Sequence, residues 1–166
     1  GFPSRPITWL HLAMTGLLLQ AGYFAFTYLS LKYGMSAGAV ALITSQQPIL
    51  IGLLAPAMAG EHVGRKRWLG LALGVAGAVI VITAQSSIHI SSTWALIFAV
   101  LALLTITGST LWEKRFGTTT HPVSASLVQY AVGLAVSAPL AFFLEPMHVQ
   151  WTIELLGSLT YLVICN

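Results

Sequence analysis

Long apolar runs separated by short polar connections are the main pattern of this sequence. A helix needs about 20 residues to cross a hydrocarbon core of about 30 Å. Apolar runs near that length occupy 8–31, 37–59, 68–84, 94–112 and 123–144, and another begins at 151. These runs are apolar on every face, whereas barrel strands would alternate. The predicted fold class is therefore all-α, a polytopic transmembrane helix bundle with five complete spans and one truncated span.

The composition supports a membrane protein and excludes several other classes. Of the 166 residues, 57% are hydrophobic and only 7% are charged, whereas soluble domains carry about 25% charge. The mean hydropathy is +0.85. The sequence opens with Gly and ends inside an apolar run, so we expect a fragment of a longer chain. The single Cys165 excludes an internal disulfide framework and a cysteine-based zinc site.

The basic residues predict the orientation of the bundle. Successive connections between the predicted spans lie on alternate sides of the membrane. Six cations fall on one of these sides, namely Arg5, Arg65, Lys66, Arg67, Lys114 and Arg115. Only Lys32 falls on the other side. By the positive-inside rule the first side is cytoplasmic, so span 8–31 begins in the cytoplasm.

The most informative polar cluster is Thr44-Ser45-Gln46-Gln47-Pro48, about halfway along an otherwise apolar span. Pro48 cannot donate a hydrogen bond to the carbonyl of Thr44, so we expect the helix to kink or loosen there. Gln46 and Gln47 point about 100° apart and need partners at membrane depth. Two interpretations remain open: hydrogen bonds that hold helices together, or the lining of a substrate path.

Two further spans carry polar side chains. Gln20, Tyr23 and Thr27 are spaced at i, i+3 and i+7, which predicts one polar stripe along span 8–31. Gln129 and Tyr130 lie in span 123–144. We expect these residues to face a cavity or another polar helix rather than lipid.

Span 68–84 carries Gly70, Gly74 and Gly77 on one helix face. Small residues of this kind let another backbone approach closely. The expected role is helix packing inside one subunit, and the alternative is dimerisation.

Glu113 is a carboxylate near the inner end of span 94–112. It is a candidate for proton coupling, and the alternative is a boundary carboxylate paired with Lys114 or Arg115. The five histidines are dispersed without the spacing of a helical metal site, so no metal or other cofactor is expected. The sequence contains neither a nucleophile elbow nor a Walker A loop, so we expect that the protein is not an enzyme. The few charges give no reason to expect nucleic-acid binding.

Taken in order, these segments resemble the EamA domain of the drug/metabolite transporter superfamily. The resemblance is carried by Tyr28-Leu29-Ser30-Leu31, Ser36–Ile43, the mid-helix Pro48, Gly60-Glu61 and the Gly-rich 68–80. In the second half it is carried by Gly108–Phe116, where Glu113 stands at a position that often reads Gln in the family.

The resemblance implies ten helices in two inverted five-helix repeats. Residues 1–84 would be the last three helices of the first repeat, 85–93 a periplasmic linker, and 94–166 the truncated start of the second. It implies a secondary-active permease of the bacterial inner membrane that exports a small metabolite, amino-acid-like compound or drug. The hypothetical cavity is lined by Gln20, Tyr23, Gln46, Gln47, Pro48, Gln129 and Tyr130. Protons as coupling ion and oligomer formation are further options, and the rival function is a non-transporting membrane scaffold.

Overall fold

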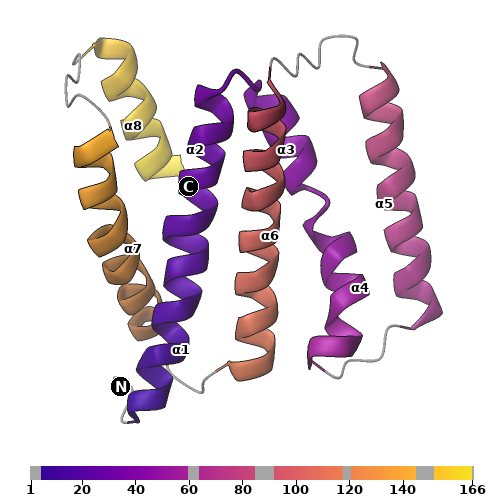
Figure 1. The fold of residues 1–166 in the computed structure, drawn as a ribbon, viewed down its shortest axis with the longest axis horizontal. Helices are drawn as coiled ribbons and strands as arrows, with labels where there is room; N and C mark the ends of the chain where they lie inside the picture. Colours follow the sequence, from indigo (N-terminus) through magenta and orange to yellow (C-terminus); the bar gives the residue numbers. More distant parts are fainter. Residues whose placement is uncertain (1–4, 60–63, 85–91, 118–120, 145–151, 166) are drawn as a thin grey trace.

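The computed structural model describes residues 5–59, 64–84, 92–117, 121–144 and 152–165. The described residues form helices only, which confirms the all-α prediction (Figure 1). Their bounds are α1 Pro6–Gly16, η1 Leu17–Tyr23, α2 Phe24–Lys32, α3 Ala37–Thr44, α4 Gln47–Ala59, α5 Arg65–Ala84, α6 Thr93–Phe116, α7 Pro122–Leu144 and α8 Ile153–Cys165. The segment η1 is π-helical.

The helices run up and down the bundle as the apolar runs predict. The first three elements form one continuous rod, Pro6–Lys32, and α3 with α4 forms a second, broken rod. Together with α6 and α7, these make four helices in the described residues that are long and apolar enough to cross a membrane. The fifth, α5, has 20 residues but begins with three cations, and its apolar stretch Trp68–Ala78 is shorter.

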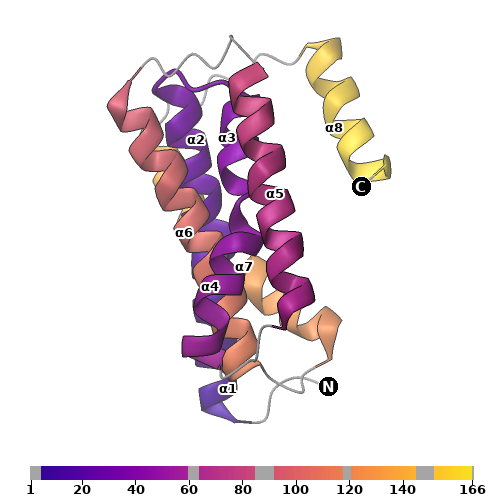
Figure 2. The same ribbon diagram turned by 90° about the vertical axis from the view of Figure 1, so that its right-hand side faces the viewer.

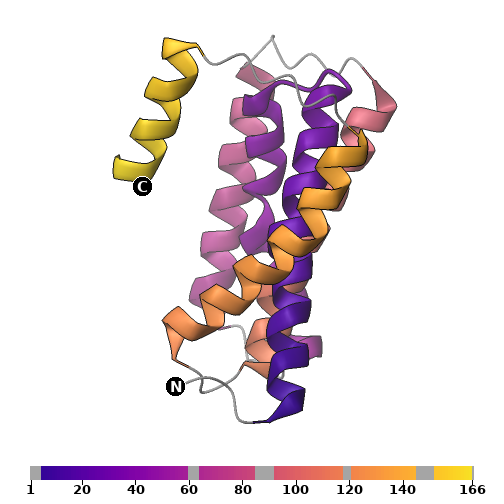
Figure 3. The same ribbon diagram turned by 90° about the vertical axis from the view of Figure 1, so that its left-hand side faces the viewer.

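Helix α6 lies at the centre of the bundle. The rod α1–η1–α2 packs on one side of it and the rod α3–α4 on the other. Helix α7 packs outside α1 and η1, and α5 packs outside α4. The last helix, α8, stands apart from these elements in both side views (Figure 2, Figure 3).

Small residues let α6 approach its neighbours closely. Ala95, Ala99 and Ala102 are completely buried and follow one face of α6. At the upper end of this face, the buried Ser30 of α2 donates a hydrogen bond to the carbonyl oxygen of Ala95 at 2.8 Å. Such close contact between helices supplies the dispersion energy that stabilises bundles in lipid, where no hydrophobic effect drives helices together.

Glycines allow a close approach between helices where the first rod crosses α7. A Cβ atom added at Gly16 would lie 2.7 Å from the carbonyl oxygen of Gln129. A Cβ atom added at Gly133 would collide with the side chain of Gln20. Both positions therefore require glycine, and the sequence analysis did not identify this crossing.

The π-helical segment corrects one expectation about the first rod. Gln20, Tyr23 and Thr27 were expected to share one face, because they are spaced for an α-helix. In a π-helix each residue turns the chain through less than the α-helical angle of about 100°. Gln20 consequently faces α7, whereas Tyr23 and Thr27 face α3 and α4.

The six cations predicted to share one side do lie at one end of the bundle. Arg5 directly precedes α1, the basic triplet opens α5, and Lys114 and Arg115 close α6. These helix ends meet at the lower end in Figure 1. Lys32 ends α2 at the opposite end.

Candidate functional site

The predicted loosening at Pro48 is confirmed as a complete break between two helices. Helix α3 ends at Thr44, and α4 begins at Gln47, with Pro48 in its first turn. At the break the N–H of Gln46 donates to the carbonyl oxygen of Ile43, three residues back, at 3.1 Å. Proline suits a first helical turn because its missing N–H would have no intrahelical partner there.

Polar side chains at the break return to the backbone of α3. The hydroxyl of Thr44 donates to the carbonyl oxygen of Val40 at 3.0 Å. The hydroxyl of Ser45 and the amide of Gln46 both donate to the carbonyl oxygen of Leu42, at 2.7 and 3.0 Å. The end of α3 thus has hydrogen-bond partners within the membrane, where water is scarce.

Gln47 reaches a different helix. Its Nε2 donates to Oγ1 of Thr110 at 2.9 Å and lies 3.5 Å from the carbonyl oxygen of Ile106, both on α6. Two roles were considered for the glutamines. Gln47 therefore has the first of them, a hydrogen bond that holds two helices together. Gln46 bonds only locally among the contacts described above, as expected for neighbouring side chains that point in different directions.

A cavity of about 380 Å³ lies beside the break, and we name it the break cavity. Its lining residues are Tyr23, Thr27, Leu31, Ala37, Val40, Ala41, Thr44, Ser45, Gln47 and Ile106. The volume falls in the range of about 300–1,000 Å³ that small-molecule sites occupy. Oγ1 of Thr27 is buried without a hydrogen-bond partner.

The structure distributes the other predicted site residues over separate places. Gln46 and Pro48 line a groove against α5. Gln20 lines a largely apolar groove against α7, and Gln129 lines a pocket near the lower end of the bundle. Tyr130 is 63% exposed on α7. Only Tyr23 and Gln47 of the predicted set share the break cavity.

The three glycines of α5 do not make the close helix contact expected of them. Gly70, Gly74 and Gly77 line the groove with Gln46 and Pro48, so they do share one face. A Cβ atom added at any of the three would meet no atom within 4 Å among the described residues. Their small size instead leaves the groove open, at about 230 Å³.

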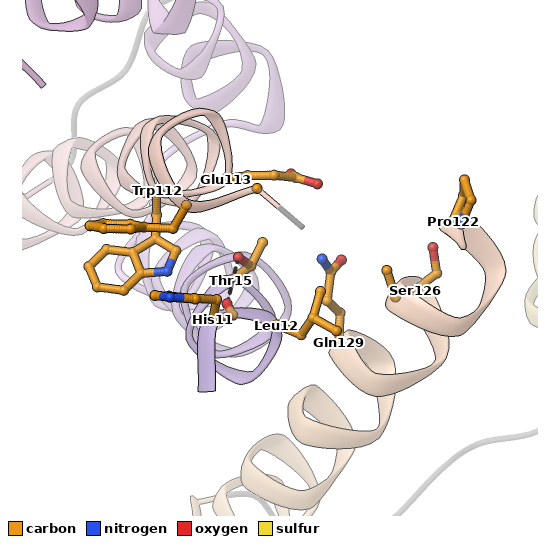
Figure 4. Close-up of a pocket in the computed structure, with 11 residues that line it drawn as sticks. His11, Leu12, Thr15, Trp112, Glu113, Pro122, Ser126 and Gln129 are labelled. Atoms are coloured by element: carbon orange, nitrogen blue, oxygen red, sulfur yellow. Dashed lines mark hydrogen bonds between the residues drawn. The ribbon is translucent and has the colours of Figure 1, made fainter. Parts of the chain in front are cut away.

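Glu113 lies in the pocket near the lower end of the bundle, which we name the end pocket (Figure 4). The pocket has a volume of about 270 Å³ and lies between α1, the end of α6 and the start of α7. Its polar side chains are His11, Thr15, Trp112, Glu113, Ser126 and Gln129. Glu113 is exposed, while the guanidinium of Arg115 lies over the ring of Phe116 at 5.3 Å.

His11 and Thr15 were not among the site residues predicted from the sequence, because histidines were weighed only as metal ligands or as a catalytic base. The available signal was their i, i+4 spacing, which places both on one face of the first helix. In the structure, Oγ1 of Thr15 donates to the carbonyl oxygen of His11 at 3.0 Å. No group of metal-binding side chains occurs among the residues that the structure describes.

A helical bundle of membrane-spanning length, with a broken helix and polar cavities between its helices, has the construction of a membrane transporter. The sequence pattern of the EamA-like transporter family matches residues 1–83. The chain therefore belongs to this family, which the resemblance had implied, and it is a multi-pass membrane protein.

Two curated relatives agree with this assignment. The chain is 26% identical over 160 residues to a probable amino-acid metabolite efflux pump of Salmonella typhimurium, covering 95% of this chain and 52% of that protein. It is 26% identical over 156 residues to the uncharacterized transporter YvbV of Bacillus subtilis, covering 93% of this chain and 50% of that protein. The chain thus spans about half the length of these relatives. No solved structure gives a significant match.

Proposed function

We propose that this chain forms half of a secondary-active transporter that exports a small metabolite, amino-acid-like compound or drug across the bacterial inner membrane. The observation that carries the proposal is the break cavity, where a helix is interrupted at membrane depth and polar side chains face a space of ligand size. Discontinuous helices of this kind form the substrate sites of many secondary transporters. The name of the Salmonella relative supports an amino-acid-like substrate and outward transport.

The proposed architecture places this chain across two inverted repeats. Residues 1–84 are the last three helices of the first repeat, 85–93 a periplasmic linker, and 94–166 the start of the second. The family match ends at residue 83, which supports a boundary at this point. The six cations at the lower end of the bundle support a cytoplasmic location for the beginning of α1.

The chemistry of the break cavity suits a neutral or zwitterionic solute. The side chains of Tyr23, Thr27 and Thr44 supply hydroxyls, and Gln47 supplies an amide. None of the described residues that line it is Lys, Arg, Asp or Glu. Hydroxyls and amides can both donate and accept, so they can replace the hydration shell of a small polar molecule. Gln46 and Pro48 then shape the break, and Tyr23 and Gln47 contact the solute.

Gln47 and Thr110 allow the two roles of the glutamine to be separated. Both variants Gln47→Leu and Thr110→Val remove the same hydrogen bond. Only Gln47→Leu also removes an amide from the cavity, because Thr110 is not among its lining residues. If Gln47 contacts the solute, Gln47→Leu loses most of the transport whereas Thr110→Val retains most of it.

The experiment uses the complete protein in proteoliposomes. Counterflow of radiolabelled amino acids and a drug panel is measured for the native protein and both variants, with the melting temperature of each. Equal losses of transport in the two variants, together with equal losses of stability, would assign Gln47 to helix packing alone. A complete native protein that moves no solute in any gradient would instead support the rival scaffold function.

A further inference from the structure

The carbonyl groups at the end of α3 can be accounted for one by one. The last four carbonyl groups of an α-helix have no N–H partner within the helix and need donors from elsewhere. In α3, the carbonyl oxygen of Ala41 accepts from the N–H of Ser45 at 2.8 Å. That of Leu42 accepts from the hydroxyl of Ser45 at 2.7 Å. That of Ile43 accepts from the N–H of Gln46 at 3.1 Å. Three of the four carbonyl groups are therefore paired.

The fourth carbonyl group, that of Thr44, has no donor among the described residues. In an uninterrupted helix the N–H of residue 48 would donate to it, but Pro48 has no N–H. Helix carbonyls point along the axis toward the C-terminal end, so this oxygen points into the break. Thr44 lines the break cavity. Because a carbonyl without a donor costs free energy at membrane depth, an occupant that donates a hydrogen bond is favoured there.

The hydroxyl groups beside this carbonyl present lone pairs rather than protons. The hydroxyl of Thr44 donates to the carbonyl oxygen of Val40 at 3.0 Å, and that of Ser45 donates to Leu42. With its one proton used in this way, each hydroxyl can only accept. Oγ of Ser45 already accepts from the amide of Gln46 at 3.2 Å, which leaves it one lone pair. The end of α3 thus offers the break cavity acceptors and no donors.

The beginning of α4 does not supply a matching set of donors. Pro48 has no N–H, and the N–H groups of Ile49 and Leu50 both donate to the carbonyl oxygen of Gln46, at 3.0 and 3.3 Å. An anion at this end of α4 would find only the N–H of Gln47 among the first four residues of the helix. The C-terminal end of α3, in contrast, carries a partial negative charge. The break therefore favours a cationic donor over an anion.

We propose that the ammonium group of the solute binds at the end of α3, where the carbonyl oxygen of Thr44 and the hydroxyl oxygens of Thr44 and Ser45 accept its hydrogen bonds. An ammonium group has three donors and no acceptor. The described lining of the cavity contains no cation of its own that could take this place. The phenol of Tyr23, which lines the same cavity, can donate to a carboxylate of the solute.

This subsite rests on the proposed transport function and narrows its substrate class to solutes with a protonated amino group. Free Na⁺ is a second source of positive charge, because helix ends and unwound carbonyls also coordinate Na⁺ in transporters. The experiment therefore has to separate the ammonium group of the solute from a free cation.

The charge preference is tested by competition in the proteoliposome assay of the complete native protein. Counterflow of each labelled amino acid that the protein moves is competed with the same amino acid and with its 2-hydroxy acid, in which a hydroxyl replaces the ammonium group. The 2-hydroxy acid should compete about tenfold more weakly, because hydrogen bonds from a charged donor are stronger than those from a neutral one. Equal competition by the two compounds overturns the proposal.

Because the 2-hydroxy acid also carries a net negative charge, a variant assigns the preference to the end of α3. Pro48→Ala supplies an N–H that can donate to the carbonyl oxygen of Thr44, so the preference should fall from about tenfold to about threefold. Pro56→Ala is the matched control and should keep the full preference, because Pro56 lies inside the same helix and does not line the cavity. An unchanged preference in Pro48→Ala, or an equal fall in both variants, overturns the subsite.

A second variant keeps the test decisive if Pro48→Ala does not fold. Thr44→Val removes one acceptor hydroxyl and leaves Pro48 in place, so the preference should again fall to about threefold. Full retention of the preference in Thr44→Val, measured on protein with a native-like melting temperature, contradicts the assignment.

Two further measurements separate the subsite from free Na⁺ and from the transport function. Counterflow is repeated with Na⁺ replaced by choline, and it should be unchanged. Counterflow that requires Na⁺ and accepts the 2-hydroxy acid equally well places free Na⁺ at the end of α3 and overturns the ammonium assignment. If the complete native protein moves no amino acid, the proposed function fails and melting temperatures decide the subsite. Amino acids, unlike their 2-hydroxy acids, should then raise the melting temperature of the native protein and of Pro56→Ala but not of Pro48→Ala, and the absence of this difference overturns the subsite.

Discussion

Gly16 is the position where a single methyl group should separate two helices. A Cβ atom there would lie 2.7 Å from the carbonyl oxygen and 2.8 Å from the Cα atom of Gln129. Both are backbone atoms, so no side-chain rotation can relieve the contact, and α1 and α7 must move apart. Overpacking of this kind costs about 1–3 kcal/mol.

The variant Gly16→Ala also changes the intrinsic stability of its helix, and a matched variant removes that contribution. Alanine favours a helix interior over glycine by about 0.5–1 kcal/mol. Gly108→Ala in α6 gains the same amount, but its Cβ atom would make an ordinary contact at 3.9 Å with Leu18. The difference between the two variants therefore isolates the packing cost, about 1–3 kcal/mol.

The assay is unfolding of the complete protein in mixed micelles with increasing SDS, followed by circular dichroism. The predicted difference corresponds to a change of about 5- to 150-fold in the unfolding equilibrium constant, since about 1.4 kcal/mol is a factor of ten. Gly16→Ala should unfold at a lower SDS fraction than Gly108→Ala. Coincident transitions for the two variants would show that α1 and α7 do not meet as the structure describes.

Three further outcomes are expected. A double-mutant cycle of Gln47→Leu and Thr110→Val should give a coupling energy of about 0.6 kcal/mol, which is typical of hydrogen bonds between membrane helices. Strictly additive effects of the two substitutions on stability would contradict the bond between these residues. Ser30→Ala should lower stability by about 0.5–1.5 kcal/mol in the same SDS titration, because it removes a buried hydrogen bond between α2 and α6. Native-like unfolding of this variant would contradict the contact. In a cysteine-free background of the complete protein, Lys114→Cys should react with an impermeant maleimide only after the cells are opened, whereas Ser36→Cys should react in intact cells. The reverse labelling pattern would invert the proposed orientation.

The order of the helices could be predicted because membrane-spanning helices are determined by local composition. Apolar runs and the distribution of cations require no knowledge of neighbouring helices. The break at Ser45-Gln46 could also be predicted, because Pro48 lacks an N–H donor whatever its surroundings in the fold. Family membership could be predicted for the same reason, because the family is recognised by the order of these local features along the chain.

The arrangement of side chains around the cavities could not be predicted in the same way. Which helix receives a given face depends on close crossings such as the one at Gly16, and those are properties of two segments together. Gly70 shows the converse: its spacing is typical of a tight helix contact, yet a Cβ atom added there would meet no described atom within 4 Å. The sequence likewise predicted one cavity lined by both Gln20 and Gln129. They lie in separate pockets because of where α7 crosses the first rod.

The π-helical turn Leu17–Tyr23 makes the first rod behave as two helices out of phase with each other. In an uninterrupted α-helix, the residues that face α7 near Gly16 would continue as one stripe along the helix. That stripe would determine which way every later side chain points. The wider turn introduces a phase slip, after which Tyr23 and Thr27 face the broken rod instead. Deleting one residue within Leu17–Tyr23 would restore a single phase, and this one-residue change would turn Tyr23 and Thr27 away from the break cavity while leaving the composition of the span almost unchanged.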